Sequence, residues 1–260
     1  MEQDAFLNTV NARMEQLQKS PEYQAKCQQF SEECARLQAI AQDLYVRKEE
    51  LQAHCEAATI RKEYASGSTL HRGYYCPSLT YDIIVGNTKR GKLLKRLTAA
   101  SKPSHEYGFD AEGKLLYCKW LYKGQLAYTE YLVYEAHCIY GITISKDGDL
   151  AYFTEETLEG GRLTVYSHCL FLTLNGAPSC LEISQEHYEY DTQGLSVCDM
   201  HHFMQSPSAP PGVPESLLAI IPRSVYRHIG RFQFRRENGL LISYTNQQGH
   251  EYQVNTQRKA

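Results

Sequence analysis

The sequence predicts an α+β protein in which an N-terminal helical hairpin or coiled-coil arm is followed by a twisted antiparallel β-sheet meander. Two residue distributions carry this prediction: no glycine precedes Gly67, and 17 of the 20 tyrosines lie at or beyond Tyr74. Glycine is costly inside helices and useful in turns, whereas tyrosine favours half-buried strands. We therefore expect a helical segment at 1–65 and a tyrosine-rich antiparallel β domain at 66–260.

The first 20 residues predict one short helix and the start of a second. Ser20 followed by Pro21 is typical of an N-cap and the first helical position, where the missing N–H of proline is harmless. The short helix before it is indicated by one apolar face, formed by Leu7, Val10, Met14 and Leu17.

The second helix carries a long apolar seam. From Tyr23 to Ala58, apolar residues recur at alternating spacings of four and three, and Lys48 is the one polar member. A helix over about 21–63 would be roughly 65 Å long, which exceeds the width of a small domain. Two interpretations stay open: the helix packs on the first helix or the sheet, or it binds a second copy or another protein. In the second case, the binding residues would be Leu37, Leu44 and Leu51.

The remainder of the chain reads as strands joined by tight turns. Leu115–Tyr122 and Gln125–Tyr134 flank Lys123-Gly124, and Gly160-Gly161 precedes an apolar run over 163–174. Further strands are predicted at 140–144, 150–154, 231–235 and 240–244, in a sheet of about eight to ten strands. Four prolines at 205–214 predict an exposed loop, and a short helix is expected after it.

A weak internal repeat links several of these turns. An aromatic residue, a polar turn, a glycine and an aliphatic residue recur at 107–115, 140–150, 188–195 and 232–240. The units at Tyr107 and Tyr188 resemble the tyrosine-aspartate repeats of the bacterial RHS/YD family, whose members form β-sheet shells around toxin domains. The resemblance implies a non-enzymatic β scaffold in a bacterial toxin or immunity setting.

The composition bears on the cellular location of the protein and on its contact with membranes. The chain has a net charge of -3, a mean hydropathy of -0.49 and no apolar run near the ~18 residues of a membrane span. Its first residues are acidic, unlike a secretory signal. Nine cysteines form no C-x-x-C pair, which indicates reduced and mostly buried thiols. We expect a cytoplasmic protein without a membrane partner.

Few residues suggest chemistry. The sequence contains no nucleophile elbow, P-loop, dinucleotide fingerprint or H-E-x-x-H motif. Neighbours on a strand point to opposite faces, so a His-Cys dipeptide cannot easily bind one ion, although His137 and His168 could meet across a sheet. We expect no cofactor, metal or catalytic residue among the candidates, which are His137, Cys138, His168, Cys169, Cys198, Asp199, His201 and His202.

The leading functional hypothesis is a non-catalytic protein-binding protein, an immunity or accessory protein of a bacterial toxin system. The alternative is a metal-dependent or Cys-His enzyme that uses strand histidines. A second alternative is RNA binding through a basic hairpin at 89–96, although nucleic acid is not expected of an acidic chain. That hairpin would contribute Lys89, Arg90, Lys92, Lys95 and Arg96.

Overall fold

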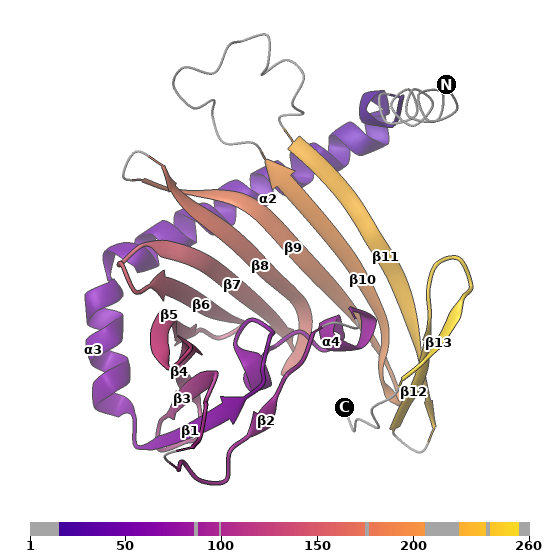
Figure 1. Ribbon diagram of the computed structural model, residues 1–260. Helices are drawn as coiled ribbons and strands as arrows, with labels where there is room; N and C mark the ends of the chain where they lie inside the picture. Colours follow the sequence, from indigo (N-terminus) through magenta and orange to yellow (C-terminus); the bar gives the residue numbers. More distant parts are fainter. Residues whose placement is uncertain are drawn as a thin grey trace, which may run out of the picture.

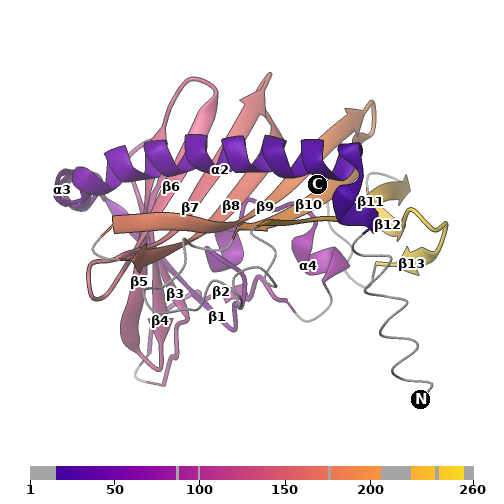
Figure 2. The same cartoon turned by 90° about the horizontal axis from the view of Figure 1, so that it is seen from above.

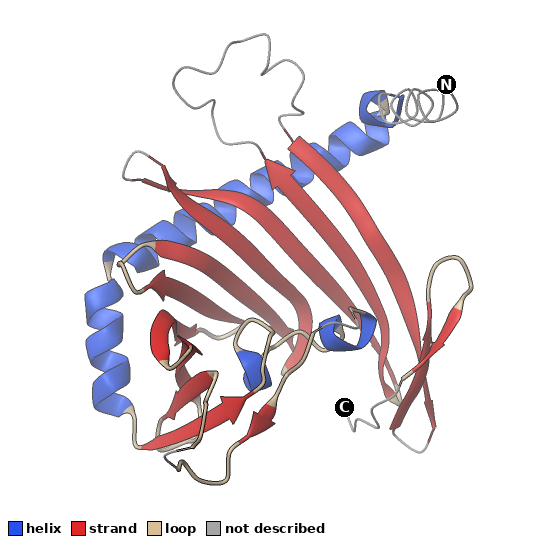
Figure 3. Ribbon diagram, viewed as in Figure 1, coloured by secondary structure: helices blue, strands red, loops and turns tan. Residues whose placement is uncertain are grey.

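The computed structural model describes residues 16–85, 88–98, 100–174, 177–205, 224–237 and 240–254. Within them, one antiparallel sheet of 13 strands runs in the order β13-β12-β11-β10-β9-β8-β7-β6-β5-β4-β3-β1-β2 (Figure 3). From β3 to β13 every strand pairs with the next one in the chain. The predicted antiparallel meander after an N-terminal helix is confirmed, but the protein is predominantly β.

The strands are β1 (Arg61–Ser66), β2 (Lys92–Leu93), β3 (His105–Phe109), β4 (Leu115–Tyr122), β5 (Gln125–Tyr134), β6 (Cys138–Ser145), β7 (Leu150–Glu159), β8 (Arg162–Leu174), β9 (Ala177–Asp191), β10 (Gly194–Gln205), β11 (Ser224–Glu237), β12 (Leu240–Thr245) and β13 (Glu251–Gln253). The helices are α2 (Pro21–Val46), α3 (Lys48–Ala58), the 3-10 helix η1 (Gly73–Tyr75) and α4 (Tyr81–Ile84).

The long helix begins where the sequence predicts. The Ser20 hydroxyl accepts a hydrogen bond from the Tyr23 N–H at 3.2 Å, and Pro21 occupies the first turn. The helix is not continuous to residue 63, however. Arg47 leaves helical geometry at φ -99° and ψ 17°, and the polar member of the seam, Lys48, opens α3.

Helix α3 ends at Ala58, whereas the predicted helix extended to about residue 63. The Cys55 carbonyl oxygen accepts from the Thr59 backbone N–H at 3.1 Å and from the Thr59 hydroxyl at 2.6 Å, so Thr59 caps the last turn. The chain then enters β1, which pairs with β3 and β2. The predicted boundary at residue 65/66 therefore falls inside a strand.

The sheet is strongly curved, and its two faces differ. Figures 1 and 2 show α2 along one face, whereas β3, β4 and β5 bend toward the opposite side, where α4 lies. We call these the helix face and the concave face. The main apolar core lies on the helix face, where α2 packs against strands that include β6, β9 and β11 and α3 packs against β5. Helix and sheet thus share one core, and no separate helical arm exists among the described residues.

Residues 67–85 and 88–91, here the inner segment, cover the concave face. Ser78 and Thr80 each donate a hydroxyl hydrogen bond at 2.8 Å to Glu186 on β9, which is 4% exposed. The Tyr188 hydroxyl accepts from the Leu79 N–H at 3.1 Å and donates to the same carboxylate at 2.7 Å. Although these hydrogen bonds oppose it, burial raises the pKa of Glu186 above its usual value.

The hairpin turns follow the predicted pattern where they are described. Lys123 and Gly124 have φ values of 50° and 80°, as a two-residue turn between β4 and β5 requires. The four repeat units correspond to strand-turn-strand segments, at β3–β4, β6–β7, β9–β10 and β11–β12. The first predicted helix, the proline-rich loop after Gln205 and the short helix beyond it lie largely or wholly outside the described residues. None of the described helices combines the length and apolarity needed to cross a membrane.

Candidate functional site

The most densely connected polar group lies between the inner segment and the concave face. Arg72 donates to Glu130 from Nε at 3.0 Å and from Nη2 at 2.8 Å, and its Nη1 donates to Glu156 at 2.6 Å. The Arg72 and Glu130 side chains are 4% and 3% exposed. Although burial opposes ionisation, Arg72 and His71 hold the pKa of Glu130 well below its usual range. The pair therefore stays charged at neutral pH.

A cavity of about 210 Å³ adjoins this ion pair. Its floor follows from strand register, because Glu130 on β5 pairs with Thr143 on β6, and Thr143 pairs with Tyr152 on β7. Residues that are directly opposite in antiparallel strands point to the same face. The register thus places three side chains from adjacent strands in one row beneath the inner segment.

Aromatic rings form one wall of the cavity. Trp120 stacks on Tyr128 with ring centroids 5.3 Å apart, and Tyr128 meets the Tyr152 ring edge to face at 5.8 Å. The Tyr152 and His168 centroids are 5.2 Å apart, and His71 closes the row at 4.7 Å from His168. Trp120 is 39% exposed, so the aromatic end of the cavity reaches solvent.

Two buried polar atoms at the cavity have no hydrogen-bond partner among the described residues. They are Nε2 of His168 and the hydroxyl oxygen of Thr143. Nε2 of His71 also lacks a hydrogen bond, but it lies 3.2 Å from a Glu130 oxygen, so we count it as an ion-pair contact. Buried polar atoms are normally satisfied, and each unsatisfied one costs about 1–3 kcal/mol. A polar occupant of the cavity would satisfy both.

The charges around the cavity disfavour an anion. Burial, reinforced by His71, lowers the pKa of His168 to about 3 and that of His105 to about 4, so both imidazoles are neutral at pH 7. The formal charges that remain are the guanidinium of Arg72, the carboxylates of Glu130 and Glu156, and the imidazolium of His71 when that ring is protonated. The carboxylates equal the cations with His71 protonated and outnumber them with His71 neutral, which favours an uncharged or cationic ligand.

The predicted partner-binding residues have another place in the structure. Leu37 and Leu44 are 0% and 4% exposed in the main core, and Leu51 is partly buried against it. The expectation that this seam presents a free surface is wrong, because the sheet of the same chain covers it. The other interpretation of the seam, packing on the sheet, is confirmed.

The five predicted cationic residues do not act as one group. Arg90 donates to the Cys76 carbonyl oxygen at 2.5 Å and to that of Ser78, and it pairs with Asp82 at 3.3 Å. Its side chain thus stabilises the fold of the inner segment through contacts within that segment. The remaining four are exposed and lie in or near the short edge strand β2, not at the tip of a hairpin. They are Lys89, Lys92, Lys95 and Arg96. RNA binding stays a prediction.

The histidine and cysteine candidates separate into different environments. All nine cysteines are free thiols, seven of them buried, and Cys169 lies in the main core as strand alternation predicts. Cys138 is partly buried against that core, and Cys198 lies near Glu186. His137 is exposed in the turn before β6, whereas His168 lines the cavity. His202 pairs with Glu182 at 2.9 Å, and Asp199 approaches His201 at 3.6 Å.

His168 was among the predicted candidate residues, whereas the rest of the site was not predicted. Glu130 carried a signal, because a carboxylate stands in the otherwise uncharged run 125–134 of a predicted strand. A charge buried within a sheet needs a partner, which here is Arg72. Arg72 lies far away in the chain in a segment without a regular pattern, so no local signal pointed to it. Comparisons with protein-family models and with curated proteins found no match for the chain.

Proposed function

We propose that the chain is a non-catalytic binding protein that takes a small ring-shaped ligand, uncharged or cationic, into the concave cavity. One observation carries the proposal: within the part of the chain that the structure describes, Nε2 of His168 and the Thr143 hydroxyl are buried at the cavity without hydrogen-bond partners. A folded protein that leaves two such groups unsatisfied is destabilised, and a ligand with a polar edge removes that cost.

The walls support a flat ligand. Trp120, Tyr128 and Tyr152 offer aromatic faces and edges, while Thr143 and His168, which lie next to Tyr152, offer hydrogen bonds. An apolar wall with a few converging polar groups is the usual composition of a small-molecule site. Aromatic faces also attract cations, in agreement with the two carboxylates at the site.

Other expected roles stay predictions. Binding of a protein partner, a bacterial toxin or immunity setting, and catalysis by strand histidines rest on the sequence alone. The cytoplasmic location is likewise an expectation from the sequence.

The substitution Thr143→Val tests the proposal because it removes a hydroxyl while keeping the shape of the side chain. We expect ligand-observed NMR to show binding of adenine, cytosine or benzamidine to the native protein, and weaker binding to this variant. The free energy of unfolding should stay equal or rise, because valine leaves no buried hydroxyl unsatisfied.

The matched control is Thr164→Val, in which the hydroxyl that is lost already donates to the Thr157 carbonyl oxygen at 3.3 Å, away from the cavity. This control should bind ligand normally. If Thr143→Val lowers stability while no probe binds the native protein, the hydroxyl is structural and the proposal fails.

A further inference from the structure

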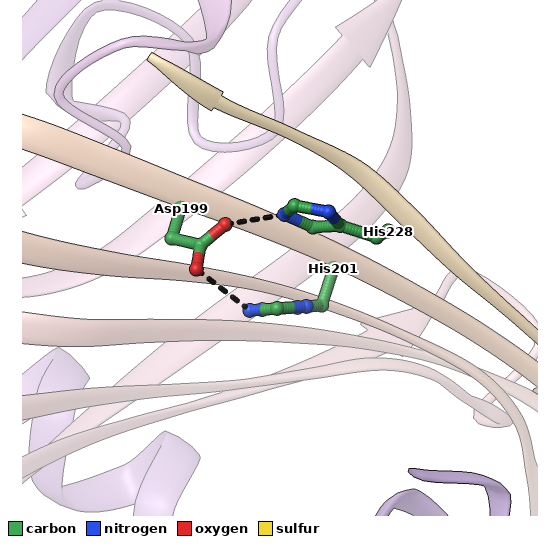
Figure 4. Close-up of side chains that lie close together, drawn as sticks. All are labelled: Asp199, His201 and His228. Carbon is green, nitrogen blue, oxygen red and sulfur yellow. Dashed lines mark hydrogen bonds and ion pairs between the residues drawn. The ribbon is translucent and has the colours of Figure 1, made fainter. Parts of the chain in front are cut away.

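A second cluster of polar side chains lies on the helix face, away from the concave cavity. Asp199 and His201 are two positions apart on β10, and His201 pairs with His228 across the hairpin to β11. A ligand atom from each of the three residues lies within 4.8 Å of the other two. Figure 4 shows the carboxylate of Asp199 beside the two imidazole rings, with one oxygen directed at each.

We propose that Asp199, His201 and His228 form a binding site for a divalent transition metal ion of the Zn²⁺ type. Two imidazole nitrogens and a carboxylate oxygen are a donor set that Zn²⁺ accepts, with a fourth position left for water. Imidazole suits borderline ions such as Zn²⁺ and Co²⁺, whereas Ca²⁺ and Mg²⁺ prefer oxygen donors.

The distances leave room for an ion. Nε2 of His228 lies 2.6 Å from Asp199 Oδ1, and Nε2 of His201 lies 3.6 Å from Asp199 Oδ2. Zn²⁺ bonds of about 2.0–2.1 Å in a tetrahedron place neighbouring ligand atoms about 3.3 Å apart. The two separations bracket this value, and no two of the three ligand atoms lie more than 4.8 Å apart, so side-chain adjustments can bring them into range.

The second observation concerns the other nitrogen of His201. Its Nδ1 lies 2.9 Å from the Tyr226 hydroxyl, and the Tyr226 N–H donates to the Tyr23 hydroxyl of α2 at 3.1 Å. When Nδ1 carries the proton and donates to Tyr226, Nε2 presents a lone pair toward the Asp199 carboxylate. A hydrogen-bonded second nitrogen is the usual support of a metal-binding histidine.

One neighbouring cation competes with an ion at this position. Nη1 of Arg231 lies 3.8 Å from Asp199 Oδ2, but Nη2 of the same residue donates to Glu189 at 2.7 Å. The guanidinium thus has its main contact elsewhere. His228 is 38% exposed, which gives an ion access from solvent.

Titration of the metal-free full-length chain with Zn²⁺ and Co²⁺, after removal of any affinity tag, tests the site. We expect one equivalent to bind by calorimetry, and Co²⁺ to give the intense visible absorption of a tetrahedral complex with nitrogen ligands. His228→Ala and Asp199→Asn should each weaken binding at least about tenfold, and Tyr226→Phe should weaken it about tenfold through His201.

His202→Ala is the matched control, because His202 on the same strand pairs only with Glu182, and its loss should leave the affinity unchanged. Circular dichroism checks that each variant is folded. Among these variants, His228→Ala is expected to disturb the fold least, because His228 is exposed. Absence of saturable binding, or equal affinity in native protein and folded His228→Ala, would overturn the proposal.

Discussion

Arg72 and Glu130 form a bidentate ion pair that joins the inner segment to the centre of the sheet, and both side chains are almost completely buried. Arg72 has a φ of 57°, which is uncommon outside glycine, so its contacts hold an unfavourable backbone conformation. Gly141 leaves space for the pair, because a Cβ at this position would overlap the Glu130 carboxylate. The ion pair therefore holds the inner segment, which includes His71, against the sheet at the cavity.

Breaking this pair should be strongly destabilising. Arg72→Met leaves the Glu130 carboxylate buried without its cation, and we expect a loss of about 3–5 kcal/mol in the free energy of unfolding. Arg72→Met combined with Glu130→Gln should recover part of this loss, because no buried charge then remains unpaired at Glu130. Urea denaturation of the native protein, Arg72→Met, Glu130→Gln and the double variant measures the coupling energy between the two side chains. A loss below about 1 kcal/mol in Arg72→Met would contradict the assignment.

Stability should fall as the pH decreases from 6.5 toward 4. The folded pKa values of His168 and His105, about 3 and 4, lie below the ordinary value of 6.5. Above pH 6.5 both rings are neutral in either state, whereas below it the unfolded chain gains protons that the folded protein excludes. Each histidine then costs at most about 1.4 kcal/mol per pH unit. Glu130 contributes to the loss of stability only at lower pH. Its pKa is lowered in the folded protein, so the unfolded chain takes up this proton first, below the usual pKa of 4.5.

Thermal unfolding between pH 7 and pH 5 checks this linkage. His168→Gln should reduce the slope of melting temperature against pH, whatever it does to the melting temperature itself. An unchanged slope would mean that His168 takes up protons equally in the folded and the unfolded states, which contradicts a lowered pKa in the folded protein.

The α2 seam should contribute to stability of the chain itself. Leu37→Ala opens a cavity at a fully buried position, and we expect a cost of about 2–5 kcal/mol in the free energy of unfolding. Val46→Ala on the same helix is the control, because Val46 is 79% exposed and its loss should cost less than about 0.5 kcal/mol. Equal effects of the two substitutions in chemical denaturation would contradict the observed packing.

Local signals predicted the hairpins well. The bounds of β4 and β5 match the prediction because Lys123-Gly124 imposes a two-residue turn between two aromatic-rich runs. The Ser20-Pro21 start of α2 was found for a similar reason, since the cap depends on adjacent residues. β1 was missed, because the charged stretch from Arg61 to Glu63 shows no clear alternation and continued a helical pattern.

The cavity could be predicted only in part, because its contacts join distant segments. Strand alternation alone could not place His168 beside His71, which are almost 100 residues apart and meet only when the inner segment folds over the sheet. His228 escaped notice for the same reason, since its contact with Asp199 depends on the β10–β11 register and its bulge after Met200. The sequence pattern shows which face a side chain takes, and the long-range packing decides what it meets.

The fluorescence of Trp120 provides the most direct test of the ligand site, because it is the only tryptophan in the chain and it lines the cavity. Titration with benzamidinium and with benzoate compares two flat ligands of similar shape and opposite charge. We predict a saturable change in Trp120 emission with benzamidinium, at an affinity at least about tenfold higher than that for benzoate, which corresponds to about 1.4 kcal/mol. No saturable change with either probe or with adenine and cytosine, or tighter binding of benzoate, would contradict the proposed site.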